Sequence, residues 1–145
     1  MLMQNALKVL LGEAVMLAEH AHRKQLDKNG RPYIDHPLRV MEAAKTYPEK
    51  IVGVLHDVVE DCGVNVQYLR QAFGDEIADA VRAISKMPCE PLEQYYARVK
   101  ANPLALAVKF LDIADNSDPK RLILLEESLR IRLALKYRKA LECLS

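Results

Sequence analysis

The sequence predicts an all-α fold, a single helical domain over residues 1–145 with about seven to eight helices. Three observations lead to this prediction. Apolar residues recur at helical spacing along almost the whole chain, and no segment shows the strict polar–apolar alternation of a half-buried strand. Only five residues are glycine. Half of the 145 residues are hydrophobic, which is enough for one core.

One apolar stripe defines the first helix, and a turn follows it. The stripe consists of Leu7, Leu10, Leu11, Ala14, Leu17, Ala18 and Ala21. Asn5 is a suitable N-cap for this helix. The polar segment 27–32 has the composition of a turn. Pro37 suits the first turn of a second helix over about residues 37–46, because that turn does not use the N–H group that proline lacks.

The third helix, expected from Pro48 to about residue 63, contains the most informative pair of the chain. His56 and Asp57 lie in an apolar run, where a buried imidazole and a buried carboxylate are costly unless something compensates them. A bound metal ion is the most direct compensation. His36 and Asp112 offer two further ligands of the right chemistry. Together the four residues predict one metal site and a metal-dependent hydrolase.

The remaining helices are also marked by caps and prolines. Asn65 can cap a fourth helix, and prolines open the sixth, the seventh and the last. The expected ranges are 65–74, 75–85, 91–100, 103–115 and, as one long helix, 119–145. The apolar stripe of the last helix, from Leu122 to Leu141, belongs either to the core or to an oligomer face. The sequence is compatible with a monomer or a homodimer.

Composition narrows the functional classes. The formal net charge is +1 and the pI about 7.7, so no overall field favours nucleic acid as a partner. The N-terminal segment carries Lys8, Glu13 and Glu19, which argues against a signal peptide and a membrane span. An odd number of cysteines without CxxC spacing favours reduced thiols and a cytoplasmic location: Cys62, Cys89 and Cys143.

Helix geometry places further polar groups beside the predicted ligands. Residues four apart share a helix face, so Glu60 lies on the face of His56 and Asp61 on that of Asp57. The two acids are therefore candidates for proton transfer. On the seventh helix one stripe carries Lys109, Asp112 and Asn116. It surrounds a carboxylate ligand with a cation and an amide.

The ligand types restrict the metal. Two imidazoles and two carboxylates suit Mn²⁺, Fe²⁺ or Zn²⁺, and the mixed nitrogen and oxygen set with open positions favours Mn²⁺ or Fe²⁺. Ions of this kind lower the pKa of water from ~15.7 to roughly 7. The sequence therefore favours hydrolysis over a purely structural site.

Three segments resemble a known family. Residues 30–37 read GRPYIDHP, residues 56–61 read HDVVED, and residues 109–116 read KFLDIADN. In this order they are similar to the hydrolase domain of RelA/SpoT proteins and to the stand-alone small alarmone hydrolases, which are HD-domain phosphohydrolases. The resemblance extends over about residues 21–122. It implies an all-α HD-domain bundle and removal of the 3′-pyrophosphate from the nucleotide (p)ppGpp, giving GDP or GTP.

The resemblance also implies roles for individual residues. Mn²⁺ would be held by His36, His56, Asp57 and Asp112, with Glu60 and Asp61 as the catalytic acids. Asn116 matches the amide that helps to hold the nucleotide. The other candidates for substrate binding are Lys109, Tyr33, Lys28 and Arg39.

One departure from the family pattern keeps other functions open. The family segment His-x-Gly-Gln-x-Arg corresponds to residues 22–27, and Asp27 occupies the arginine position. Arginine has a planar fork that stacks and binds bidentately, which Asp27 and the neighbouring Lys28 lack. One alternative is therefore a phosphohydrolase for another nucleotide, NADPH 2′-phosphate or a nucleoside monophosphate. The other is a regulatory module that binds a nucleotide without turnover.

Overall fold

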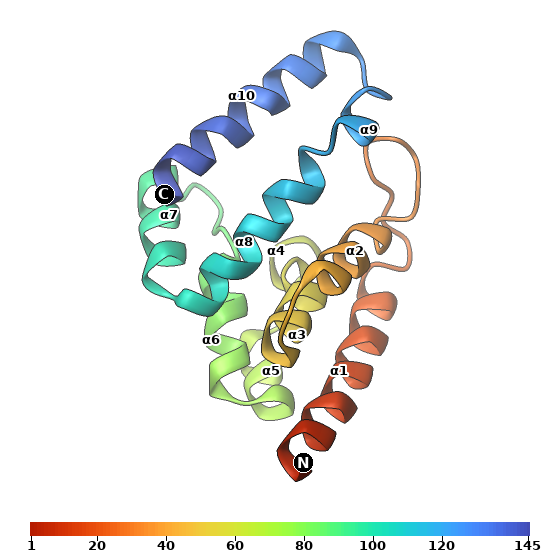
Figure 1. The fold of residues 1–145 in the computed structure, drawn as a ribbon, viewed down its shortest axis with the longest axis vertical. Coiled ribbons are helices and arrows are strands. Elements are labelled where there is room, and N and C mark those ends of the chain that lie inside the picture. Colours follow the sequence, from red (N-terminus) through yellow and green to blue (C-terminus); the bar gives the residue numbers. More distant parts are fainter.

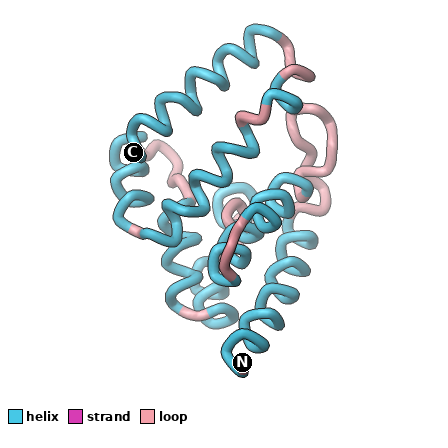
Figure 2. The backbone as a smooth tube through the Cα atoms, in the orientation of Figure 1, coloured by secondary structure: helices cyan, strands magenta, loops and turns pink.

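The computed structural model describes residues 1–145 and is helical throughout (Figures 1 and 2). The helices are α1 (Leu2–Ala21), α2 (Asp35–Ala43), α3 (Tyr47–Leu55), α4 (Val58–Cys62), α5 (Val66–Phe73), α6 (Asp75–Ile84), α7 (Leu92–Ala101), α8 (Pro103–Asn116), α9 (Pro119–Leu122) and α10 (Glu127–Leu144). The only extended pairing is an isolated bridge between Leu26 and Pro32. The predicted all-α class is confirmed. None of the helices combines the length and hydropathy that a membrane crossing requires.

The larger of two hydrophobic clusters is built around α3. Five consecutive α3 residues, 51–55, are buried, because the apolar run there is continuous and neighbouring helices surround it. Thr46 caps this helix by accepting a hydrogen bond from the Glu49 N–H. Gly53 allows α2 to approach closely, since a Cβ there would lie 3.2 Å from Val40 Cγ1. The tight packing fixes the end of α3, where the His56–Asp57 pair begins.

A smaller cluster joins α7, α8 and α10. Its buried members are Tyr95, Tyr96, Val99, Ile113, Ala140 and Leu144. Helix α8 serves both clusters, because Ala105 and Val108 pack into the larger one and Ile113 into the smaller one. Asp112 is also buried on this helix. The polar site is therefore held between two packed regions.

The prediction of one helix from Pro48 to residue 63 is wrong at its centre. Helix α3 ends at Leu55 and α4 begins at Val58, so His56 and Asp57 lie at a break. The His56 ring lies 2.6 Å from the Gly53 carbonyl through Nδ1. The segment ends at Gly63, whose φ of 70° is the left-handed conformation that glycine adopts without strain.

The prediction of a single long C-terminal helix is also wrong. The short α9 and the longer α10 are separated by a turn, and α10 runs back past α8 (Figure 1). Asp118 caps α9 through the Lys120 N–H. Because α10 turns back, its side chains can reach the region of the predicted site.

Helix boundaries elsewhere differ by a few residues. The first helix starts at Leu2, without the predicted cap at Asn5, and the second starts at Asp35, so Pro37 lies within its first turn. The Asn65 cap is confirmed, with its side chain accepting a hydrogen bond from the Gln67 N–H at 2.7 Å.

Candidate metal and nucleotide site

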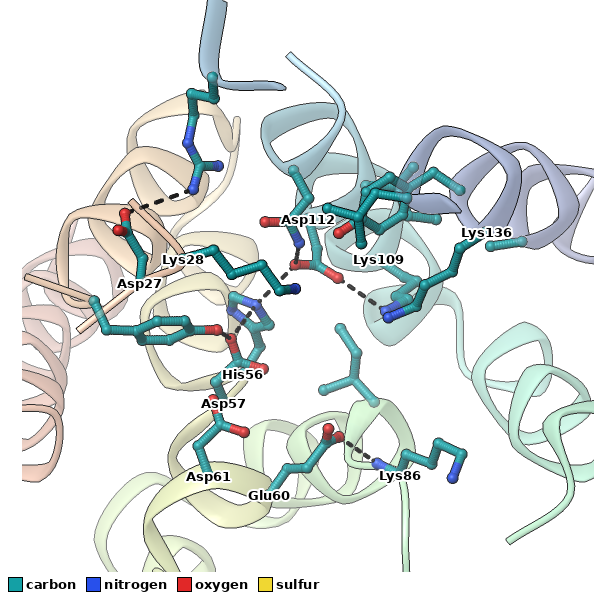
Figure 3. A pocket seen from close by; sticks show the side chains of 18 of the residues that line it. Asp27, Lys28, His56, Asp57, Glu60, Asp61, Lys86, Lys109, Asp112 and Lys136 are labelled. Carbon is teal, nitrogen blue, oxygen red and sulfur yellow. Dashed lines mark hydrogen bonds and ion pairs between the residues drawn. The ribbon is translucent and has the colours of Figure 1, made fainter. Parts of the chain in front are cut away.

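A cavity of about 390 Å³ lies where α4, α8, α10 and the α1–α2 loop meet (Figure 3). This volume is within the range of small-molecule sites. Nine of the eleven predicted site residues line it: Lys28, Tyr33, His56, Asp57, Glu60, Asp61, Lys109, Asp112 and Asn116. His36 lies behind the cavity wall, in contact with Asp112. Arg39 does not line the cavity.

The four predicted metal ligands converge at one end of the cavity. The Nε2 atoms of His36 and His56 lie 2.9 and 3.2 Å from the same oxygen, Asp112 Oδ1. Asp57 Oδ2 lies 3.1 Å from His56 Nε2 and 3.8 Å from His36 Nε2. One donor atom each from His36, His56 and Asp112 falls within 4.8 Å of the others. Such a cluster has the spacing and chemistry to hold a metal ion.

The outer nitrogen of each imidazole has its own acceptor. His36 Nδ1 lies 2.6 Å from Asp115 Oδ2, and His56 Nδ1 lies 2.6 Å from the Gly53 carbonyl oxygen. When neutral, as a metal-binding imidazole must be, each ring therefore carries its proton on Nδ1 and presents a lone pair on Nε2. Those lone pairs face carboxylate oxygens, and acceptors that face each other need a cation or extra protons between them. The donor set thus fits a metal ion.

The break between α3 and α4 brings both members of the His56–Asp57 pair to one point. In a continuous helix adjacent side chains diverge by about 100°. At the break, His56 Nε2 and Asp57 Oδ2 approach to 3.1 Å. The Tyr33 hydroxyl donates a hydrogen bond of 2.5 Å to Asp57 Oδ2. Burial and the nearby Asp57 carboxylate raise the pKa of Tyr33, so its hydroxyl stays protonated and remains a donor.

Charges and amides around Asp112 match the predicted α8 stripe. Lys109 Nζ donates to Asp112 Oδ2 at 2.8 Å, and Asn116 Nδ2 donates to Asp112 Oδ1 at 3.0 Å. Burial opposes ionisation of Asp112, but Lys109 and the two imidazoles outweigh it and hold its pKa well below the usual value. Asp112 is therefore anionic at neutral pH, as a metal-binding carboxylate must be.

The sequence did not identify Asp115 as part of the site. Besides His36, its carboxylate binds Arg39 Nε at 2.8 Å and Arg121 Nη1 at 2.8 Å. Burial raises the pKa of Asp115, but His36 and Arg39 lower it to about 2. The available signal was its position three residues after Asp112, one turn along α8. Arg39, which the sequence predicts to bind substrate, binds the Asp115 carboxylate and does not line the cavity.

The two predicted catalytic acids lie at the rim of the same cavity. Glu60 Oε1 accepts a hydrogen bond from the Lys86 N–H at 2.7 Å, and Asp61 Oδ2 accepts one from Gln25 Nε2 at 3.2 Å. Burial and the Asp57 charge raise the pKa of both acids. A carboxylate with a raised pKa accepts a proton more readily, which suits general acid–base chemistry.

Four lysines also line the cavity. Lys28, Lys86, Lys109 and Lys136 come from four different parts of the chain and are labelled in Figure 3. Partial removal of water from around the Lys136 ammonium group and the neighbouring Lys28 and Lys109 charges lower its pKa, although the side chain remains exposed. Lys86 and Lys136 were missed, because neither lies within a recognisable motif and α10 was expected to continue straight.

Asp27 has a structural role at the cavity edge. Its Oδ1 accepts hydrogen bonds from the backbone N–H groups of Asn29 and Arg31, at 2.8 and 3.0 Å. Its Oδ2 lies 4.0 Å from Arg121 Nη2. Asp27 therefore stabilises the α1–α2 turn and draws a cation from α9 towards the cavity.

Comparison with known sequences shows similar relatives among much longer proteins. The chain is 28% identical over 149 residues to a probable GTP pyrophosphokinase of Mycobacterium leprae, covering 94% of this chain and 18% of that protein. It is 36% identical over 81 residues to the bifunctional (p)ppGpp synthase/hydrolase SpoT of Escherichia coli, covering 53% and 12%. It is 28% identical over 144 residues to the guanosine-3′,5′-bis(diphosphate) 3′-pyrophosphohydrolase of Aquifex aeolicus, covering 86% and 21%. The chain spans about a fifth or less of these relatives.

The fold also matches a solved structure. A metazoan ortholog of SpoT, described as hydrolysing ppGpp, superimposes with a TM-score of 0.76 and 20% identity, covering 93% of this chain and 85% of that one. The sequence pattern of the HD domain family matches residues 14–103, which include His36, His56 and Asp57. The chain therefore belongs to the HD-domain family.

Proposed function

We propose that the protein is a metal-dependent phosphohydrolase that removes the 3′-pyrophosphate of (p)ppGpp. The observation that carries the proposal is one cavity in which a buried His–His–Asp cluster adjoins two acids and several lysines. Relatives named for this hydrolysis support the choice of substrate. We also propose that residues 1–145 act as one hydrolase unit, because the cavity is lined from the α1–α2 loop to α10.

His36, His56, Asp57 and Asp112 would hold the metal, and we propose Mn²⁺ because the ligand set mixes imidazole and carboxylate. A divalent ion at this position supplies Lewis acidity that makes water a better nucleophile near neutral pH. The Nδ1 contacts of the two imidazoles fix the direction of their Nε2 atoms before any ligand arrives.

The acids at the rim handle the protons of the reaction. Water adds to the phosphorus next to O3′, the P–O3′ bond breaks, and pyrophosphate leaves. Glu60 or Asp61 takes the proton of the attacking water, and the ribose O3′ receives a proton as the bond breaks. The two products are GDP, or GTP from the longer substrate, and pyrophosphate.

The lysines offset the charge of the substrate. Lys109 is held beside Asp112 and therefore lies next to the proposed metal ligands. Lys28, Lys86 and Lys136 also line the cavity. Cations around the cavity lower the electrostatic cost of bringing phosphates towards a carboxylate-rich site. Asn116 and Tyr33 line the cavity beside Asp112 and Asp57 and are the proposed nucleotide contacts.

A second candidate substrate follows from Asp27. Its carboxylate is used by the turn and by Arg121, so the cavity lacks an arginine fork at this position. A nucleotide without guanine, such as NADPH carrying a 2′-phosphate or a nucleoside monophosphate, then competes as the target. We further propose a cytoplasmic monomer or homodimer with a small nucleotide as its partner, rather than nucleic acid or a membrane.

The test is product analysis by anion-exchange chromatography after incubation of Mn²⁺-loaded protein with ppGpp. GDP and pyrophosphate that disappear with chelator establish the proposed reaction. The same assay with NADPH and nucleoside monophosphates gives relative kcat/KM values. Higher kcat/KM for one of these transfers the function to that substrate. Tight nucleotide binding with metal bound but no turnover points instead to a regulatory module.

A further inference from the structure

A buried histidine outside the metal cluster is connected to one of the catalytic acids. His22, at the end of α1, is 1% exposed, and its Nδ1 lies 2.7 Å from Gln25 Oε1. The other end of the same amide donates from Gln25 Nε2 to Asp61 Oδ2 at 3.2 Å. Three side chains thus form a continuous chain of hydrogen bonds from the core to the cavity rim.

The contacts of the Gln25 side-chain amide with His22 and Asp61 fix the direction of this chain of hydrogen bonds, and Cys62 Sγ also lies near it, 3.2 Å from His22 Nδ1. If the amide were reversed, its oxygen would face the Asp61 carboxylate, and two acceptors would oppose each other. With the oxygen towards His22, Nδ1 must carry the imidazole proton and donate it to Gln25. His22 Nε2 is then left as a buried nitrogen with no partner. Leaving a buried polar atom unsatisfied is unfavourable, so packing alone does not account for an imidazole here.

The surroundings of Gln25 hold its backbone as well. Its N–H donates to the His22 carbonyl at 2.9 Å, and its carbonyl accepts from the Tyr33 N–H at 2.9 Å. The His22 ring also lies beside the Tyr33 ring, with centroids 5.1 Å apart. The backbone of Gln25 is therefore held by hydrogen bonds on both sides, which restricts the movement of its side-chain amide beside Asp61, as a positioning group requires.

We propose that His22 and Gln25 are positioning residues that hold the Asp61 carboxylate in its catalytic orientation. The inference rests on the proposed hydrolase function, since it assigns Asp61 a part in turnover. His22 does not touch the substrate and acts only through Gln25. Neither His22 nor Gln25 forms a hydrogen bond with the metal cluster, so metal affinity should not depend on them.

Steady-state kinetics of Gln25→Leu test whether Gln25 positions Asp61. The substrate is whichever nucleotide the wild-type protein hydrolyses. We expect kcat to fall about tenfold, as for other residues that orient a reacting group, with KM and Mn²⁺ affinity almost unchanged. Gln71→Leu, an exposed glutamine of α5, is the matched control and should behave like the wild type. In an Asp61→Asn background, Gln25→Leu should cause no further loss. Additive losses in this cycle would overturn the proposal.

The conservative variant separates positioning from packing. In His22→Asn the side-chain amide nitrogen can replace the Nδ1 donor, whereas His22→Leu cannot donate. We expect His22→Asn to retain most of the kcat and His22→Leu to lose as much as Gln25→Leu. Equal losses of kcat in both His22 variants at unchanged Tm would contradict a positioning role for His22.

An NMR measurement tests the same idea without any activity. The ring nitrogens of His22 should show a proton on Nδ1 and none on Nε2 in the wild-type protein, and this preference should be lost in Gln25→Leu. A proton on Nε2 in the wild type would overturn the inference. Failure of ppGpp as a substrate, by contrast, would affect only the proposed function.

Discussion

Two groups of charged side chains around the cavity differ in how firmly the fold holds them. In the candidate metal cluster, His36 and Asp112 are buried, and each is bonded to at least two other side chains. By contrast, Lys28 and Lys136 line the cavity as exposed side chains that form no ion pair with a carboxylate. The difference teaches that the buried contacts hold the proposed metal ligands in place before any substrate arrives, whereas the exposed lysines are not held by ion pairs.

The largest effect is expected when the Asp112 carboxylate is replaced, because it contacts both imidazoles, Lys109 and Asn116. We expect Asp112→Asn to lose Mn²⁺ binding and to lower turnover by about a thousandfold or more, since Lewis acidity is worth several kcal/mol. Calorimetric metal titration and product assays measure both effects. Asp79→Asn, on the exposed face of α6, serves as control. Full turnover in Asp112→Asn would remove this residue from the ligand set.

Glu60→Gln separates proton transfer from metal binding. The amide keeps the size of the side chain but cannot accept a proton, so we expect kcat to fall about 10²- to 10⁴-fold. Metal affinity should stay the same, because Glu60 bonds to the Lys86 backbone and not to the cluster. An unchanged kcat would exclude Glu60 from the mechanism and leave Asp61 as the base.

Replacing Asp115 tests how far metal affinity depends on the carboxylate that holds the His36 ring in place. We expect Asp115→Asn to weaken Mn²⁺ binding about 10- to 100-fold, because the His36 ring loses its anionic partner. Arg39→Met should act in the same direction but less, through Asp115. Calorimetry on both variants checks the order. A raised KM at constant metal affinity in Arg39→Met would instead restore its predicted contact with substrate.

The smallest effect is expected when an exposed lysine of the cavity is replaced. An exposed charge pair contributes about 0.2–1 kcal/mol, so Lys136→Gln should raise KM about twofold to fivefold and leave kcat unchanged. The effect should shrink at high salt, because ions screen exposed charges. Lys139→Gln, on α10 but outside the cavity, is the matched control. Equal KM values for the two variants would show that Lys136 does not meet the substrate.

The sequence predicted the fold well where local signals dominate. Asn65 and the prolines placed α5, α7 and α8 within a residue or two, because caps and missing N–H groups act locally. The break after Leu55 was not predictable from periodicity, since an apolar run looks the same in one helix or two. At the break His56 Nε2 and Asp57 Oδ2 lie 3.1 Å apart, a contact that the apolar pattern does not encode.

The same reasoning explains which site residues were found and which were missed. The motif residues converge as predicted, because helix spacing alone placed Lys109, Asp112 and Asn116 on one stripe. Asp115 and Lys136 were missed for a different reason. Their roles depend on tertiary placement, namely the packing of α2 on α8 and the return of α10 over the cavity.

The central proposal is a single metal centre held by His36, His56, Asp57 and Asp112. Anomalous diffraction from crystals of the Mn²⁺-loaded protein tests this centre most directly, because it locates the metal without assuming an activity. The account predicts a single strong peak between the two Nε2 atoms and the two carboxylates. A peak elsewhere, or none at this cluster when the metal is bound in solution, would contradict it.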